Sequence, residues 1–194
     1  MKYGKENFNP GDVVILNDPF EGGTHIPDTT FTMPIFVGDE LLGFAVSRGH
    51  WQDLGGGAAG GQSFGTHIAG EGLRIPPLKL FNEYKINEDL LTLIKNNTRC
   101  PEYIEGDIQA HMGALKVAEQ EFIRGAEKYG IDTIKIAMRE LIAYTNRISR
   151  SRILAIPDGE YSVSDFVDTD GFSDKPIRLE VKIIIKGESL VVDF

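Results

Sequence analysis

The fold of the first part of this chain is decided by the stretch Phe31-Thr32-Met33-Pro34-Ile35-Phe36-Val37-Gly38-Asp39-Glu40-Leu41-Leu42-Gly43-Phe44-Ala45-Val46-Ser47. Two apolar runs, 31–37 and 41–47, lie on either side of the short turn sequence Gly38-Asp39-Glu40. Apolar runs of this length, joined by a few residues that include glycine, are typical of a β-hairpin. The stretch therefore predicts two antiparallel strands.

The segments around this hairpin also read as strands and loops. Upstream, the short apolar run Val13-Val14-Ile15-Leu16 ends at Asn17-Asp18-Pro19, which is a strong turn signal. Downstream, the glycine-rich run 55–61 has too little side chain to pack a core, and it predicts either a loop whose backbone approaches another group closely or a disordered linker. Pro76-Pro77 then breaks the chain before Leu78-Lys79-Leu80, so residues 1–80 form a β and loop region.

The middle of the chain, residues 87–150, reads as helical. Asn87 is a plausible N-cap for a first helix. Pro101 suits the first turn of a longer helix that ends near Gly130, and Asp132 is expected to cap a third helix. The second helix keeps its apolar residues on one stripe, and the third has apolar positions of its own: Ile104, Ile108, Leu115, Phe122 and Ala126, then Ile136, Leu141, Ile142 and Ile148.

Strands return in residues 159–194. The segments 159–164, 177–185 and 190–194 are apolar or alternating, and Gly187-Glu188 predicts a hairpin between the last two. The order of strands, helices and strands favours an α+β fold over a doubly wound sheet. We interpret residues 1–194 as one partial domain, and the apolar ending at Phe194 leads us to expect a fragment of a longer protein.

Composition excludes several classes of function. The chain has 194 residues and a net charge of −9, which argues against nucleic acid or an anionic membrane as a partner. No apolar run approaches the length of a membrane span, and the polar stretch 1–10 is no signal peptide. Cys100 is the only cysteine, so no intrachain disulfide forms, and a cytoplasmic protein is expected. This cysteine is either a nucleophile or, more commonly, a small buried apolar side chain.

Three residues are candidates for a metal site: His25, Asp28 and His50. Pro27 keeps the first two extended, so they cannot share a helical face but can converge from a tight loop. His50 follows the strand 41–47 and meets them if that strand runs beside the first. Three protein ligands leave positions open for water and substrate, as in catalytic metal sites. The alternative is a histidine that hydrogen-bonds a loop backbone.

Five further residues are candidates for catalysis or substrate binding. Asp18 and Asp53 are candidate catalytic carboxylates, Asp53 either as an acceptor for a ligating imidazole or as a general base, but each also suits a turn. Arg74 suits an anionic substrate group or a surface salt bridge. His67 and Glu71, candidates for substrate binding, are four residues apart in a glycine-rich segment that favours a loop over a helix. His111, within the long helix, is expected at the surface or at an interface.

Four ordered motifs together resemble the hydantoinase B/oxoprolinase family. They are Gly11-Asp12-Val13 through Asn17-Asp18-Pro19-Phe20, then Gly22-Gly23-Thr24-His25-Ile26-Pro27-Asp28, then His50-Trp51-Gln52-Asp53-Leu54-Gly55-Gly56, and then Glu71-Gly72-Leu73-Arg74-Ile75-Pro76-Pro77. Later segments also fit, namely Asn87 to Asn97, Arg99-Cys100-Pro101-Glu102 and Gly106-Asp107. The family includes the B subunit of N-methylhydantoinase, the C-terminal part of 5-oxoprolinase and the alpha subunit of acetone carboxylase.

The resemblance implies a metal-bearing subunit of an ATP-dependent cyclic-amide hydrolase, which opens a hydantoin or lactam ring with metal-activated water. By resemblance, His25, Asp28 and His50 are the ligands of a divalent Mn, Zn or Fe ion. ATP is used by a hydantoinase A-like partner subunit, in keeping with the absence of a GxxxxGK[ST] phosphate loop from this chain. The partners implied are that subunit and a small cyclic amide.

Two departures from the family pattern keep alternatives open. Family members are longer at both ends. In them, a segment before the Gly-Asp-Val motif carries a further acidic residue near the metal. This chain begins too late to contain that segment, so we expect its active site to be incomplete. Trp51 stands where the hydantoinase-like pattern often has a second histidine. The alternatives are therefore the alpha subunit of an acetone-carboxylase-like enzyme and a catalytically incomplete interaction module.

Overall fold

The computed structural model describes residues 3–61 and 65–194. The chain divides into two compact units, Met1–Ile134 and Lys135–Phe194, which are described separately. Strands and helices are segregated along the chain and both sheets are antiparallel, so the predicted α+β class is confirmed.

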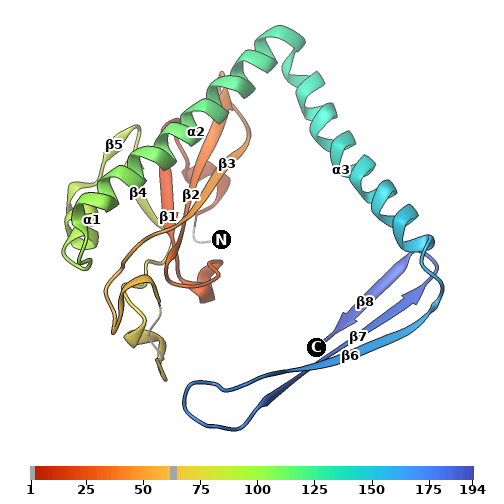
Figure 1. Ribbon diagram of the computed structural model, residues 1–194. Coiled ribbons are helices and arrows are strands. Elements are labelled where there is room, and N and C mark those ends of the chain that lie inside the picture. The colour runs from red at the N-terminus through yellow and green to blue at the C-terminus, as the bar shows by residue number, and fades with distance from the viewer. Residues whose placement is uncertain (1–2, 62–64) are drawn as a thin grey trace. The chain divides into compact units, whose positions relative to one another are not determined.

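The first unit contains a five-stranded antiparallel sheet with the order β3-β2-β1-β4-β5 (Figure 1). The predicted hairpin is confirmed, and it is longer than the apolar runs alone indicated, because β2 begins at Asp28 and β3 ends at His50. Gly38 in its turn has φ +59°, a conformation that glycine adopts without strain. The strands are β1 (Val13–Leu16), β2 (Asp28–Val37), β3 (Glu40–His50), β4 (Leu78–Asn82) and β5 (Lys85–Ile86).

Two helices of this unit follow the sheet, α1 (Glu88–Lys95) and α2 (Pro101–Tyr129). The predicted N-cap is confirmed, since the Asn87 side chain accepts a hydrogen bond from the N–H of Leu90. Pro101 occupies the first turn of α2, and Gly130 ends it, as predicted. The described part of this unit also contains short 3₁₀ helices, namely η1 (Lys5–Asn7), η2 (Pro19–Glu21), η3 (Ala59–Gly61) and η4 (Ile68–Gly70).

The core lies between one face of the sheet and α2, which crosses that face (Figure 1). Burying each of these large apolar side chains stabilises the fold by roughly 1.5–3 kcal/mol. The buried side chains of this layer are Ile15, Phe31, Met33, Leu80, Ile104, Ile108, Met112 and Leu115.

His111 also lies in this layer, so the expectation of a surface or interface histidine is wrong. His111 is only 7% exposed to solvent. It follows Ile108 by three residues and precedes Leu115 by four, so the helical period places all three on the face that packs against the sheet.

The second unit holds most of α3 (Ile131–Leu154) and a three-stranded antiparallel sheet with the order β6-β7-β8. The helix and the terminal hairpin are confirmed, but Asp132 lies in the first turn of α3 and does not cap it, because the helix begins directly after Gly130. The strands are β6 (Gly159–Val167), β7 (Ile177–Lys186) and β8 (Ser189–Asp193).

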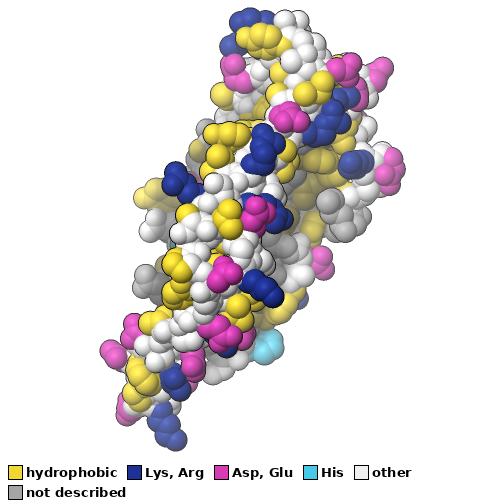
Figure 2. Space-filling model, turned by 90° about the vertical axis from the view of Figure 1, so that its right-hand side faces the viewer, with side chains coloured by type: hydrophobic (Ala, Val, Ile, Leu, Met, Phe, Trp, Pro, Cys, Tyr) yellow, Lys and Arg dark blue, Asp and Glu magenta, His cyan; other side chains and the backbone are white. Residues whose placement is uncertain are grey.

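Apolar side chains of the second unit are often exposed, including Leu141 and Ile142 on α3. Figure 2 shows one face of the molecule, on which hydrophobic side chains lie among basic and acidic ones. Over the residues described, no helix combines the length and the apolar character needed to cross a membrane.

Candidate functional site

Asp28 and His50 lie opposite one another at the end of the β2–β3 ladder. Directly opposed residues of an antiparallel pair project from the same face of the sheet. Along β3 the exposure alternates, since Val46, Arg48 and His50 are exposed whereas Ala45 is buried beneath α2. Asp28 and His50 therefore project from the face that α2 does not cover.

His25 completes this group from the loop before β2. Its Nε2 lies 3.1 Å from Oδ1 of Asp28, and its ring centroid is 5.2 Å from that of His50. The other oxygen of Asp28 accepts a 2.9 Å hydrogen bond from the hydroxyl of Thr24. The structure thus brings together all three residues that the sequence predicts as ligands.

The Asp28 carboxyl group is held in its ionised form. Partial burial raises its pKa, but hydrogen bonds from Thr24 and His25 and the nearby imidazoles of His25 and His50 outweigh this, so the pKa lies below its ordinary value. An ionised carboxylate beside two imidazoles is a donor set that suits divalent transition metals.

The three side chains do not yet form a ligand set. Among residues 3–61 and 65–194, no three His, Cys, Asp or Glu side chains are arranged to hold one ion. In the arrangement seen, His25 contacts Asp28 directly, so metal ligation requires that this imidazole turn toward a shared ion. The chemistry of the donors fits a metal, and the ligand assignment stays a prediction.

Asn17 fixes the loop that carries His25, and its role was not predicted from the sequence. Its fully buried side chain donates hydrogen bonds to the carbonyls of Ile26 (2.7 Å) and Leu73 (3.0 Å), and it accepts one of 2.6 Å from the N–H of Ile75. This one amide joins the end of β1 to two loops that are distant in the sequence. The only sequence signal was a polar residue directly after a buried strand.

Asp18 and Arg74, predicted for different roles, form an ion pair. Nε of Arg74 lies 3.2 Å from Oδ2 of Asp18, whose side chain is 8% exposed. The other oxygen of Asp18 accepts a 3.0 Å hydrogen bond from the N–H of Phe20 and caps η2, so the turn role considered for this residue is present. Asp18 therefore orients Arg74 while it holds the turn before His25.

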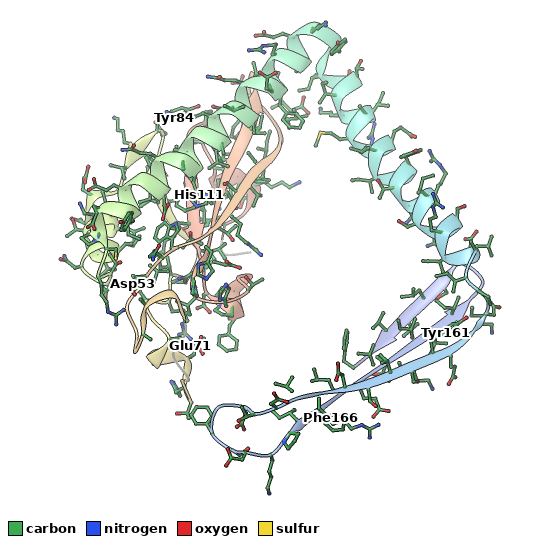
Figure 3. All side chains as sticks on the ribbon, in the orientation of Figure 1. Asp53, Glu71, Tyr84, His111, Tyr161 and Phe166 are labelled. Carbon is green, nitrogen blue, oxygen red and sulfur yellow. The ribbon has the colours of Figure 1, made fainter. Side chains whose placement is uncertain are left out.

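Asp53 is buried and paired with Arg99, a residue whose role was also not predicted. Both the guanidinium and the backbone N–H of Arg99 donate to its carboxylate, each at 2.5 Å. Burial opposes ionisation of Asp53, but these bonds and the charge of Arg99 hold its pKa below the ordinary value. The contacts with Arg99 suit an anchoring role for Asp53, which is labelled in Figure 3, beneath the glycine-rich loop.

The glycine-rich run shows the close backbone approach that its composition predicts. A Cβ atom at Gly56 would lie 2.6 Å from the carbonyl group of Glu71, and Gly56 has φ +76°. Arg99 donates a further hydrogen bond to the Gly56 carbonyl. Residues 55–61 form a loop that ends in the short η3, so the predicted loop is confirmed.

His67, Glu71 and Arg74 lie in one short segment of the chain, and His67 and Arg74 line the same pocket. His67 and Arg74 border a cavity of about 510 Å³ together with Gly55, Gly56 and Asn97. Nδ1 of His67 accepts a 3.1 Å hydrogen bond from the N–H of Ala69, so a neutral His67 carries its proton on Nε2. Glu71 ends η4, which spans only three residues, so a loop carries this pair, as expected.

His111 contacts the sheet from the opposite side to the His25, Asp28 and His50 group. Its side chain is labelled in Figure 3. Its Nδ1 lies 2.8 Å from the hydroxyl of Ser47, and its ring stacks on Phe31 with centroids 4.3 Å apart. Burial lowers the pKa of His111, against an opposing effect of Asp107. This histidine thus stays neutral near pH 7 and supports the end of β3 from beneath.

The chain is similar to known proteins in sequence. The family model described as hydantoinase B/oxoprolinase matches residues 1–194. The chain is 34% identical over its full length to a Pseudomonas protein named as the B component of a D-/L-hydantoinase, of which it covers 34%. It is 35% identical over 92% of its length to the beta chain of caprolactamase from Pseudomonas jessenii, covering 31% of that protein. The chain thus spans about a third of the length of these relatives.

The chain is also similar to solved structures. The crystal structure of the ATP-dependent caprolactamase from Pseudomonas jessenii matches 96% of the chain with a TM-score of 0.89 and 33% identity, and the chain covers 32% of it. A nucleotide-free acetone carboxylase structure matches 98% with a TM-score of 0.87 at 20% identity, which shows a shared fold, and the chain covers 27% of it.

Proposed function

The chain belongs to the hydantoinase B/oxoprolinase family, and on this basis we propose that it is part of the metal-bearing subunit of an ATP-dependent cyclic-amide hydrolase. The observation that carries the proposal is the convergence of His25, Asp28 and His50 on the face of the sheet that α2 does not cover. The proposed reaction is the opening of a hydantoin or lactam ring.

Two amide-hydrolase relatives are more similar to the chain in sequence than a carboxylase relative is. Identity is 34% and 35% to the hydantoinase and caprolactamase proteins, against 26% to the delta chain of an acetophenone carboxylase from Aromatoleum aromaticum. A carboxylase-like function is the second candidate, since the acetone carboxylase structure shares the fold.

In the proposed site, His25, Asp28 and His50 hold a divalent Mn, Zn or Fe ion. Such an ion supplies Lewis acidity toward a carbonyl oxygen and lowers the pKa of a water molecule that it binds. Asp28 contributes a carboxylate that Thr24 keeps oriented and ionised. The amide of Asn17 fixes the loop that presents His25, which limits the freedom of the site before substrate binds.

The remaining candidate residues are proposed to bind and orient the substrate. Arg74 and His67 face a common pocket, and Asp18 fixes the Arg74 guanidinium. Glu71 is proposed to bind substrate on the same segment. A general-base role for Asp53 stays a prediction, and its ion pair with Arg99 better supports an orienting role for the glycine-rich loop.

A partner is proposed for the ATP-dependent step. The chain carries no GxxxxGK[ST] phosphate loop, and we propose that a hydantoinase A-like subunit uses the ATP. A cytoplasmic location goes with this assembly as a prediction from the single cysteine.

The test is an assay of the full-length protein that contains this chain, purified together with its ATP-using partner. We expect ATP-dependent ring opening of a hydantoin or lactam, reduced about 100-fold or more by His50→Ala. Bicarbonate-dependent consumption of a ketone, without ring opening, would instead support the carboxylase function. If His50→Ala left the ring-opening rate unchanged, the proposed site would be wrong, and no activity with stable partner binding would favour an interaction module.

A further inference from the structure

A groove of about 880 Å³ lies in the first unit, and no role has yet been assigned to it. Apolar side chains from several elements make up most of its lining, with Glu21 as the charged residue among them. Two of the lining residues are well exposed: Phe20 is 77% exposed and Val46 is 62% exposed. A concave apolar surface of this volume is in the range of small-molecule binding sites.

Strand register places this groove on the same face of the sheet as the His25, Asp28 and His50 group. Val14 of β1 is paired with Thr32 of β2, and Thr32 is paired with Val46 of β3. All three line the groove. Side chains that project from one face recur at every second residue, so Thr32 lies on the face of Asp28, and Val46 lies on the face of His50.

The distance between the groove and the metal-site candidates follows from the same register. Asp28 and Thr32 are four residues apart in one strand, which corresponds to roughly 13 Å. Leu16, which also lines the groove, is paired with Thr30, only two residues or about 7 Å from Asp28. The near end of the groove is therefore within reach of a molecule whose reacting carbonyl lies beside Asp28.

On β2 and β3, two polar side chains lie between the two regions. Arg48 is paired with Thr30, and its Nε donates a 2.9 Å hydrogen bond to the Thr30 hydroxyl. Along this face, going from Asp28 and His50 toward the groove, the guanidinium of Arg48 and the hydroxyl of Thr30 come first, and the apolar side chains of the groove follow. A ligand with a polar ring and an apolar substituent matches this order.

The opposite face of the same strands is already occupied. Phe31 and Met33 of β2 are fully buried beneath α2, and Ser47 of β3 contacts His111. The groove is thus not part of the hydrophobic core of the first unit.

We propose that this groove binds the apolar substituent of the cyclic-amide substrate, with the ring at Asp28 and His50. The proposal rests on the proposed function, and it selects hydantoins or lactams with an aliphatic or aromatic substituent over unsubstituted rings. Transfer of apolar groups from water makes each buried methylene worth about a fourfold gain in affinity.

The experiment measures binding and turnover separately with the full-length protein and its partner subunit. Binding of hydantoin, 5-methylhydantoin, 5-isobutylhydantoin and 5-benzylhydantoin is measured by titration calorimetry in the presence of Mn²⁺ and without ATP. We expect affinity to rise with the size of the substituent, and kcat/KM for ATP-dependent opening to rise in the same order.

Val46→Asp tests the groove directly, because it places a carboxylate in the lining of the groove. We expect the affinity ratio of 5-benzylhydantoin to hydantoin to fall at least tenfold. Val117→Asp is the matched control, since Val117 on α2 is 60% exposed and does not line the groove. Val46→Thr keeps the β-branched shape and is expected to lower the ratio severalfold even if Val46→Asp folds poorly.

The outcomes separate the two proposals. Ring opening with equal affinity for all four hydantoins would overturn the groove assignment and leave the proposed function intact. Graded binding without any ring opening would support the groove and count against the proposed function. An unchanged ratio in both Val46 variants, with lowered thermal stability alone, would overturn the proposal and indicate that other polypeptide covers the groove.

Discussion

Asp28 and His50 are paired residues at the end of the β2–β3 ladder, so an ordinary hairpin register places a carboxylate beside an imidazole. His25 reaches this pair from a loop, and Asn17 fixes that loop through three hydrogen bonds. The candidate site thus has two residues on a rigid element and one on a restrained one, which is the arrangement that keeps ligand geometry reproducible.

Metal content is the first prediction. We expect the full-length protein to contain about one divalent ion per chain and His25→Ala or His50→Ala to lose most of it, because each variant removes one of few ligands. Elemental analysis of the purified proteins measures this. His67→Ala is the matched control, since His67 caps η4 through Nδ1. Stoichiometric metal in the His50 variant would refute the ligand assignment.

Asn17→Ala is expected to lower the free energy of unfolding by about 2–4 kcal/mol. The substitution leaves the buried carbonyls of Ile26 and Leu73 and the N–H of Ile75 without the amide that pairs with them. Denaturant unfolding measures the change. Asn97→Ala, which removes one exposed hydrogen bond to Leu93, is expected to cost less than about 1 kcal/mol. Equal effects of both variants would contradict the anchoring role of Asn17.

Arg99→Ala is expected to destabilise the protein by roughly 3 kcal/mol at pH 7, because it leaves the buried Asp53 carboxylate without its cationic partner. Arg124→Ala is the control, since Arg124 pairs with Glu121 on an exposed helix surface and should cost less than about 1 kcal/mol.

The Asp53–Arg99 pair also predicts a dependence on pH. The pKa of Asp53 is lowered in the folded state, so its stabilising effect is present above the ordinary value of 3.8 and is lost as the pH falls through the lower folded value. Arg99→Ala removes the charge and the guanidinium hydrogen bond but keeps the backbone N–H groups of residues 99 and 55, so we expect this acid-side loss to be smaller in the variant. A wild-type stability curve that stayed parallel to that of the variant below pH 5 would contradict the pairing.

His111 predicts a second loss of stability, at less acidic pH. Burial lowers its folded pKa below the ordinary 6.5, with Asp107 opposing, so the unfolded state takes up a proton first as the pH falls. Its effect is fully present above pH 6.5, and stability then falls by at most about 1.4 kcal/mol per pH unit until the folded pKa is reached. We expect His111→Phe to keep the ring contact with Phe31 and to flatten the stability curve between pH 6.5 and 5. An unchanged slope in this variant would refute the prediction.

Gly56→Ala tests the close approach in the glycine-rich loop. Both Gly56 and Gly38 have positive φ, but only at Gly56 would a Cβ atom meet backbone, whereas nothing lies within 4 Å at Gly38. We expect Gly38→Ala to cost about 1 kcal/mol from conformational strain alone and Gly56→Ala to cost clearly more, as measured by thermal unfolding. Similar costs would mean that the loop adjusts without loss.

Much of the fold was predictable because its signals are local. The hairpin of β2 and β3, the N-cap at Asn87 and the end of α2 at Gly130 each depend on residues that are neighbours in the sequence. The residues that hold the loops together were not predictable in this way. Asn17 and Arg99 act through partners dozens of positions away, and nothing in their immediate sequence distinguishes them from ordinary turn residues.

The sequence by itself determined the longer strands and helices, the α+β class and the family, because periodicity, capping residues and ordered motifs are properties of the chain alone. Tertiary structure decided which predicted residues meet: Asp28 with His50 and Asp18 with Arg74. It also decided that His111 is buried. The physical reason is that strand register and helix packing bring distant residues together, and a side chain's burial and partners exist only after that assembly.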